Sequence, residues 1–548
     1  MVTLETNYKK ILDSLKNKPS IEALEETLEQ LGMEVDEQIG DEIKIDVTAE
    51  RPDLVSTQGL VRAIKAFQQE PITEYYAQRS DYEVTITKEV ASVRPHTCCV
   101  VVKNLRLTQE LLDEIIWVQE KLHATFGRHR KKAAIGIYPL EHIRFPVTYT
   151  ADKPTNISFR PLDHNKTITA DQLGDTPTGK QYLPLLKDSP VYPYFVDDNQ
   201  QVLSIPPIIN SYDTGRVTEQ TTSVFIECSG HDHKALSLTL NIIAYLFQDL
   251  GGELYQVTTK YPKKTIITPE FDTRTKEITC AYAQTIMGVA LSSEEMASLL
   301  KKMLYTIVET KKDSVIVRVP PIRADVWHDV DVVDDLIRAY GINNLEPTMP
   351  MPRTQASTLP ETKRKKRLSE LLIGQGYLEA YTFILSNNKQ QYNHMLIEED
   401  DHMKLGHSTE ASLNMVRTWI VPELMNTLKN NRNATLPVKL FEVGEVVLPN
   451  KNKDTLSETA WRLGLVECDT NANLTTIRQS TDVLLRALGM DYEIVPKEHG
   501  SFIEGRCAAI KVGGKEVAVL GEIKPEVLVN WGIKHPVVAA EFTLTKEF

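Results

Sequence analysis

An acidic segment in the second half of the chain has the residue types and spacing for metal chemistry. Asp325 stands ahead of a predicted helix in the run RADVWHDVDVVDDLIRAYG, and Asp331, Asp334 and Asp335 lie within that run. If the helix begins near Asp329, the last three carboxylates share one face, where like charges repel. A divalent cation relieves such repulsion, and oxygen ligands without His or Cys suit magnesium or calcium. The spacing therefore indicates a candidate magnesium site.

The same four acids have a second interpretation, which spacing alone does not separate from the first. Acidic side chains close to the start of a helix stabilise the positive end of the helix dipole without any metal. Metal binding and dipole stabilisation both stay open from the sequence.

A proline pair marks a second unusual segment, VLSIPPIINSY. Pro206 and Pro207 stand among apolar residues and are followed by Asn210 and Ser211, which indicates a rigid buried turn. Such a turn either lines a cavity or serves the fold alone, and residue types by themselves favour the structural role.

Two basic runs, residues 128–132 and 363–367, have the charge to meet RNA phosphates. Runs of charge usually face water, so a solvated surface is the favoured interpretation of each. The net charge of −13 argues against a general nucleic-acid binder but leaves room for small basic patches.

Common catalytic and nucleotide-binding motifs are missing from the sequence. It contains neither G-x-G-x-x-G nor a P-loop, and the lone Gly513–Lys515 run is predicted to be a hairpin turn between alternating strands. None of the 13 histidines sits in a recognisable nucleophile signature. The six cysteines form no C-x-x-C pair, which argues against a structural zinc site and a disulfide framework.

Length and patterning predict several domains in a cytoplasmic protein. A chain of 548 residues is too long for one hydrophobic core and corresponds to about three to five domains. No apolar run approaches the roughly 20 residues of a membrane span, and the first residues lack the apolar stretch of a secretory signal. We therefore expect no association with membranes.

Capping residues and periodicity predict the elements that position these side chains. Ser20 can cap one amphipathic helix, and Ser292 with Glu295 forms a capping box for another. The proline-containing segment 346–360 is predicted to be a linker. The predicted helices are residues 21–31, 56–67, 111–122, 236–250, 294–304, 331–340 and 367–374, with strands between them.

Five stretches in order along the chain resemble the β-subunit family of phenylalanyl-tRNA synthetase, in the shorter form of archaea and the eukaryotic cytosol. Each stretch is weak alone, but their order and spacing together are specific. The stretches are DVTAERPDLVSTQGLVRAI, KLHATFGRHRKKAAIGIYPLEHI, VLSIPPIINSY with VFIECSG, IRADVWHDVDVVDDLIRAYGINNLEP, and VRTWIVPELMNTLKNN with LFEVGEVV.

The resemblance implies an α+β multidomain fold with four parts. These are an N-terminal α/β domain (1–82), a mixed α/β tRNA-editing domain (83–262), a small winged-helix-like domain with the acidic metal cluster (263–348), and a non-catalytic module with the antiparallel sheet of class II synthetases (359–548). It also implies Mg²⁺ at the acidic cluster. A separate α subunit would hold phenylalanine and ATP, and an α2β2 heterotetramer would bind the phenylalanine tRNA.

The resemblance further implies a pocket that hydrolyses tyrosine wrongly attached to this tRNA. The pocket residues carried over are Ser204, Pro206, Pro207, Glu227 and Ser229. Where the family has an Asp and a Thr flanking one residue, this chain has Glu227 and Ser229. The functional groups are kept, but the carboxylate is one methylene longer.

Two other functions compete with this expectation. One is a tRNA-binding or assembly scaffold whose editing pocket has decayed, and the other is a free-standing hydrolase of mischarged tRNA. The last module is not expected to be catalytic, because an adenylating site needs arginines that grip ATP phosphates. Arg417 and Arg506 lack the Gly-rich strand of such a site, so both are interpreted as structural.

Overall fold

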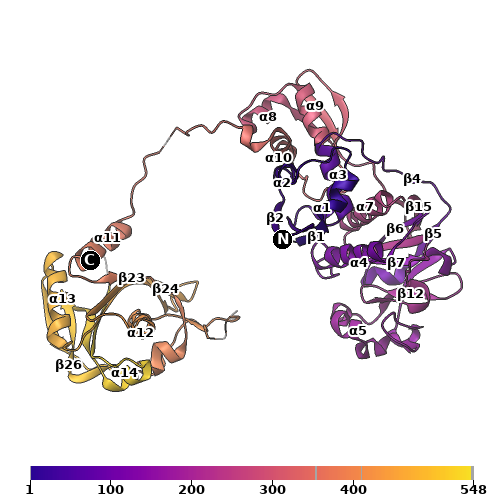
Figure 1. The fold of residues 1–548 in the computed structure, drawn as a ribbon. Coiled ribbons are helices and arrows are strands. Elements are labelled where there is room, and N and C mark those ends of the chain that lie inside the picture. Colours follow the sequence, from indigo (N-terminus) through magenta and orange to yellow (C-terminus); the bar gives the residue numbers. More distant parts are fainter. Residues whose placement is uncertain (1, 352–353, 409, 411, 545–548) are drawn as a thin grey trace. The chain divides into compact units, whose positions relative to one another are not determined.

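The computed structural model describes residues 2–351, 354–408, 410 and 412–544, and the chain divides into two compact units (Figure 1). The first unit is Met1–Met349 and the second is Pro350–Phe548. The division falls inside the predicted linker 346–360, of which residues 352 and 353 lie outside the described residues. Within the first unit, three successive parts of the sequence form separate sheets.

The first part is a small antiparallel sheet covered by helices. Its strand order is β1-β3-β2, and its strands are β1 (Val2–Asn7), β2 (Glu34–Ile39) and β3 (Glu42–Val47). The helices are α1 (Tyr8–Ser14), α2 (Ile21–Gln30) and α3 (Thr57–Phe67). The hydroxyl of Ser20 caps α2, which confirms that predicted helix start, and Ser56 caps α3 in the same way.

The second part is an 11-stranded sheet that contains the candidate pocket. The order along its main path is β13-β12-β11-β8-β5-β15-β6-β14-β7, and β4 and β16 also pair with β15. The strands are β4 (Ala77–Gln78), β5 (Glu83–Ile86), β6 (His96–Lys103), β7 (Ala133–Pro139), β8 (Val147–Asp152), β11 (Tyr192–Val196), β12 (Val202–Ile205), β13 (Ile209–Asn210), β14 (Val224–Gly230), β15 (Glu253–Lys260) and β16 (Thr265–Thr268).

Strand β14 is buried along its whole length because it lies between β6 and β7. Its side chains alternate between two hydrophobic cores, with Ile226 in the first and Phe225 in the second. Helices α4 (Gln109–Ala124) and α7 (His233–Asp249) contribute to the first core. Smaller elements outside this sheet are β9 (Ser158–Phe159), β10 (Ile168–Thr169), α5 (Pro177–Tyr182) and α6 (Tyr212–Gly215).

The third part combines three helices with a three-stranded antiparallel sheet of order β17-β19-β18. Ser292 and Glu295 form the expected capping box at the start of α9, and α10 begins at Asp329. The elements are β17 (Thr275–Thr279), α8 (Cys280–Met287), α9 (Ser293–Lys302), β18 (Thr306–Thr310), β19 (Ser314–Arg318) and α10 (Asp329–Tyr340).

The second unit is built on a seven-stranded sheet of order β20-β23-β24-β28-β27-β26-β25, antiparallel except for the β20–β23 pair. A Gly513–Gly514 turn joins β26 to β27, which confirms the predicted hairpin. The strands are β20 (Leu378–Glu379), β23 (Val438–Pro449), β24 (Ser457–Cys468), β25 (Tyr492–Pro496), β26 (Phe502–Val512), β27 (Lys515–Ile523) and β28 (Val537–Thr543), with β21 (Leu385–Ser386) pairing with β22 (Met415–Val416).

Two hydrophobic cores belong to this unit. Helices α11 (Pro360–Ile373) and α13 (Leu474–Ala487) contribute to one, and α12 (Val421–Asn430) and α14 (Pro525–Trp531) contribute to the other. None of the helices in the described part of the chain is long and apolar enough to cross a membrane.

Arg417 is a structural residue of the second unit. Its side chain is almost completely buried, and its Nη2 lies 2.7 Å from Glu442 Oε1. The same guanidinium donates to the carbonyl of Glu445 and to the hydroxyl of Thr382, both at 2.8 Å. All of its bonds are internal to the fold, which agrees with the structural role expected for this arginine.

Candidate functional site

A cavity of about 600 Å³ lies in the first unit, between helix α4 and the residues that join β12 to β13. Its lining includes Ser204, Pro206, Pro207 and Glu227, four of the five residues that the family resemblance assigned to one pocket. The volume is within the roughly 300–1,000 Å³ range of small-ligand sites. The proline pair therefore lines a cavity, in addition to any structural role.

Glu227 is a deeply buried acidic residue of the cavity lining. It lies in the middle of β14, opposite Cys99 of β6 and Gly136 of β7, and is only 2% exposed. Its Oε1 is 3.2 Å from the hydroxyl of Tyr138, whereas Oε2 is buried and has no hydrogen-bond partner among the described residues. Burial raises the pKa of Glu227 to about 8, so the side chain is mostly uncharged at neutral pH.

Tyr138 is a member of this site that sequence reasoning missed. Its hydroxyl lies 2.7 Å from Ser204 Oγ as well as close to Glu227, so one phenol links the two pocket residues. A Cβ on Gly136 would come within 2.2 Å of the Tyr138 hydroxyl and 2.6 Å of Glu227 Oε1. Glycine inside a strand often marks such a close approach, so Gly136 was the available signal.

Ser229 does not line the cavity, in contrast to the expectation for it. Its hydroxyl lies 3.2 Å from Nε of Arg94, a buried arginine ahead of β6, and Nη2 of Arg94 donates to the Ser229 carbonyl at 2.5 Å. The same Nη2 donates to the carbonyl of Arg130 at 3.1 Å. Ser229 therefore helps to anchor the wall of the pocket.

Arg130, which also lines the cavity, holds the wall that the proline pair forms. Its Nη1 donates to the carbonyls of Pro207 and Ile208 at 3.3 and 2.9 Å. Its guanidinium stacks on the ring of Tyr182, with Cζ 3.9 Å from the ring centroid, and it pairs with Glu120 at 2.9 Å. The wall is thus held by a cation that comes from the basic run 128–132.

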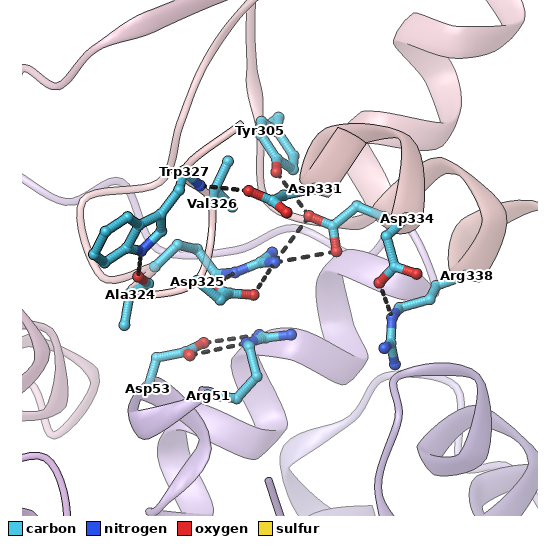
Figure 2. A network of polar contacts seen from close by, with 12 residues as sticks. Arg51, Asp53, Tyr305, Ala324, Asp325, Val326, Trp327, Asp331, Asp334 and Arg338 are labelled. Atoms are coloured by element: carbon cyan, nitrogen blue, oxygen red, sulfur yellow. Dashed lines mark hydrogen bonds and ion pairs between the residues drawn. The ribbon is translucent and has the colours of Figure 1, made fainter. Parts of the chain in front are cut away.

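The acidic segment forms a polar network around a buried arginine (Figure 2). Arg323 pairs in bidentate fashion with Asp325, at 2.8 and 2.7 Å, and lies 2.9 Å from Asp335. The hydroxyl of Tyr305 donates to Asp335 at 2.7 Å. Burial raises the pKa of Asp335. Burial also acts to raise the pKa of Asp325, but the hydrogen bonds and positive charge of Arg323 hold that pKa below its ordinary value. Arg51, labelled in Figure 2, adds positive charge nearby.

The other two aspartates turn toward different partners (Figure 2). Asp331 accepts the backbone N–H groups of Trp327 and His328, both at 2.6 Å, at the start of α10. Asp334 is exposed and pairs with Arg338 one turn later, at 2.8 Å. Asp331 therefore fits the interpretation that an acid stabilises the helix start.

These contacts do not fit a magnesium ion held by the four aspartates together. Arg323 occupies two of the carboxylates, and the backbone and Arg338 take the others. In the described part of the chain, no group of three or more His, Cys, Asp or Glu side chains is arranged to hold a metal ion. Repulsion between the acids is relieved by arginine, so these contacts favour a segment that is stable without metal, and chelation tests the magnesium site that the sequence predicted.

We expect a chelator to leave the thermal unfolding of the chain unchanged. Asp335→Asn should lower the free energy of unfolding by about 3 kcal/mol, because it removes a buried carboxylate that pairs with the buried Arg323. The matched variant Asp334→Asn breaks an exposed pair and should cost less than about 1 kcal/mol. Calorimetry with and without EDTA measures both effects, and a drop in stability on chelation would instead support a metal site.

Three family models match successive regions of the chain. Residues 1–70 match the Phe-tRNA synthetase beta subunit B1 domain, and residues 276–342 match the tRNA synthetase B5 domain. Residues 345–544 match the phenylalanyl tRNA synthetase beta chain CLM domain.

Three similar archaeal proteins carry the same name. A phenylalanine–tRNA ligase β subunit from Pyrococcus furiosus is 34% identical over 90% of this chain and 89% of its own length. Those of Archaeoglobus fulgidus and Methanocella arvoryzae are 35% and 32% identical, covering 95% and 99% of this chain and 94% and 99% of their own lengths.

A solved structure agrees with these relatives. An N-terminal fragment of the phenylalanyl-tRNA synthetase β subunit from Pyrococcus horikoshii is 31% identical, with a TM-score of 0.59, and covers 62% of this chain and 99% of the fragment. Its fold is therefore shared by much of the first unit, a mixed α/β structure with several sheets. Because the relatives match across nearly the whole chain, the chain belongs to the family of phenylalanine–tRNA ligase β subunits.

Proposed function

We propose that the chain hydrolyses mischarged Tyr-tRNA in the cavity that Glu227 lines, while an α subunit in an α2β2 heterotetramer attaches phenylalanine to the tRNA with ATP. As a β subunit of an aminoacyl-tRNA ligase, the chain has an α subunit and tRNA as partners by membership of the family. The proposed parts are the N-terminal domain 1–82, editing domain 83–262, winged-helix-like domain 263–348 and non-catalytic synthetase-like module 359–548, in a cytoplasmic enzyme.

One observation supports the editing proposal: a buried carboxyl oxygen at the cavity wall has no hydrogen-bond partner in the part of the chain that the structure describes. Oε2 of Glu227 is that atom, and Glu227 is part of the cavity lining. A tyrosine hydroxyl entering the cavity can complete it, whereas a phenylalanine side chain would leave it unpaired. A site built to bond a hydroxyl rejects the analogue that lacks it, often by several orders of magnitude.

The reaction is hydrolysis of the ester that joins the amino acid to the terminal ribose of the tRNA. Water adds to the ester carbonyl, and the ribose oxygen leaves with a proton. Ser204 is one of the hydroxyl residues that line the pocket, and its side-chain hydrogen bond is to Tyr138 and not to a histidine base, so we assign it to binding and not to nucleophilic attack. The protein's part is to hold the ester where water and the neighbouring ribose hydroxyl can act.

The direct test is deacylation by the chain together with its α subunit. Preformed Tyr-tRNA should be cleared much faster than Phe-tRNA, measured as loss of acid-precipitable amino acid. If the parent clears neither, the scaffold alternative gains support.

The chain alone should form no Phe-tRNA, and addition of the α subunit should restore synthesis. The physical reason is that the best-buried arginine of the second unit, Arg417, is committed to Glu442 and cannot grip ATP phosphates. Aminoacylation assays of the separate and mixed subunits measure this. Synthesis by the isolated chain at a rate near that of the mixture would contradict the assignment of catalysis to the α subunit.

A further inference from the structure

The basic run at the cavity adopts an unusual backbone. Arg128, His129 and Arg130 have φ angles of 50°, 53° and 65°, so three consecutive residues with side chains lie in the left-handed region. Side chains crowd the backbone there, and such strain persists where surrounding contacts fix it, commonly at functional sites. Here the N–H of Lys132 donates to the Gly127 carbonyl at 2.9 Å and closes the turn.

One residue of the turn faces the protein, and its neighbours face solvent. Arg130 is bonded to the carbonyls of Pro207 and Ile208 and stacks on Tyr182, so the turn is attached to the cavity wall. Arg128, His129 and Lys131 are exposed. The exposed residues Arg128 and Lys131 thus belong to a turn that Arg130 attaches to the cavity wall.

Three acidic side chains that line the cavity have partners other than Arg128 and Lys131. Glu120 pairs with Arg130 at 2.9 Å. Glu219 accepts the backbone N–H of Gln109 at 3.0 Å, and Asp163 accepts that of Thr178 at 2.9 Å. The exposed cations of the turn therefore remain available to an anionic partner.

We propose that the turn 127–132 is a phosphate-binding element that guides the single-stranded end of tRNA into the cavity, with Arg128 and Lys131 on the RNA backbone and Arg130 as the anchor. This inference rests on the proposed editing function, which supplies RNA as the substrate of the same cavity. An arginine can bind a phosphate through two parallel N–H groups, and a rigid turn loses little freedom when it binds. The partner is thus an RNA strand, recognised by its phosphates and not by its bases.

The test is the double variant Arg128→Gln/Lys131→Gln in the assembled ligase. Two lost phosphate contacts should weaken tRNA binding about 10-fold or more at low salt. They should also reduce the slope of log K against log salt concentration by about 1.4, since each contact to a single strand contributes about 0.7. For Tyr-tRNA hydrolysis the KM should rise, while kcat at saturating Tyr-tRNA changes less than about twofold.

Lys88→Gln/Lys153→Gln is the matched control, because it removes two exposed cations elsewhere in the same unit. It should leave affinity and salt slope near the parent values. Unchanged binding and slope in the turn variant would overturn the inference, as would an equal loss in the control. The affinity and the salt slope are measured by tRNA binding alone. Failure of the editing proposal is a different result, in which the parent protein does not hydrolyse Tyr-tRNA.

Discussion

Replacing Glu227 with alanine should slow hydrolysis of Tyr-tRNA by about 10- to 100-fold. The variant removes the buried oxygen that would bond the tyrosine hydroxyl, and a hydrogen bond of this kind contributes about 1.5–3 kcal/mol. Phe-tRNA synthesis should be nearly unchanged, because the α subunit carries that reaction in the proposed scheme. Single-turnover deacylation and steady-state aminoacylation measure the two activities on one preparation.

The matched variant Glu227→Gln keeps the size of the side chain and removes its ionisation. Because burial raises the pKa of Glu227 to about 8, the parent carboxyl is protonated and able to donate below that pH. Tyr-tRNA hydrolysis by the parent should therefore fall as pH rises through about 8, relative to the glutamine variant. A parent profile that rises through pH 8 would show that the ionised carboxylate is the working form.

The same shift predicts a stability change that does not depend on activity. The pKa of Glu227 rises from 4.5 in the unfolded chain to about 8 in the folded chain. The contribution of this group to the free energy of unfolding is therefore fully present below pH 4.5 and is lost as the pH increases to 8. At pH 7 the unfolded state gains from ionisation while the folded state stays protonated. Glu227→Gln should thus stabilise the fold at pH 7 by about 2–3 kcal/mol, measured by denaturant unfolding.

Replacing Tyr381 and Phe383 with serine should abolish stable association with the α subunit. These side chains are 87% and 82% exposed, in the short segment between β20 and β21, and Leu378 and Leu385 nearby are also exposed. Large aromatic side chains are costly to leave in water and commonly dominate the energy of subunit interfaces. Two such losses of about 2 kcal/mol each would weaken binding about 1,000-fold.

Val529→Ser is the control for this prediction. Val529 lies on α14 of the same unit and is 77% exposed, but it is aliphatic and stands outside the segment 378–385. Its variant should assemble like the parent in analytical ultracentrifugation. Normal assembly of the Tyr381/Phe383 variant would show that another surface meets the α subunit, whereas circular dichroism would reveal a variant that simply fails to fold.

Some features of the structure were already determined by short stretches of sequence. Ser20 and Ser292 begin helices where expected, because a capping hydroxyl and the N–H group it bonds are only three residues apart. The Gly513–Gly514 hairpin is also determined by neighbouring residues, because the two glycines of the turn adopt the positive φ angles that the turn requires. Helix α10 begins at Asp329, two residues before the predicted range 331–340, and has Asp329 and Asp331 in its first turn.

The partners of the site residues were decided only by tertiary structure. The four aspartates have helical spacing that permits a metal, but Arg323 and Tyr305 arrive from outside the helix and take the buried carboxylates. Glu227 likewise meets Tyr138 because sheet register places β7 beside β14, across 89 residues of sequence. Capping bonds form between neighbours in the chain, whereas the pairing of a buried carboxylate depends on which distant strand or loop packs against it, and residue spacing does not encode that choice.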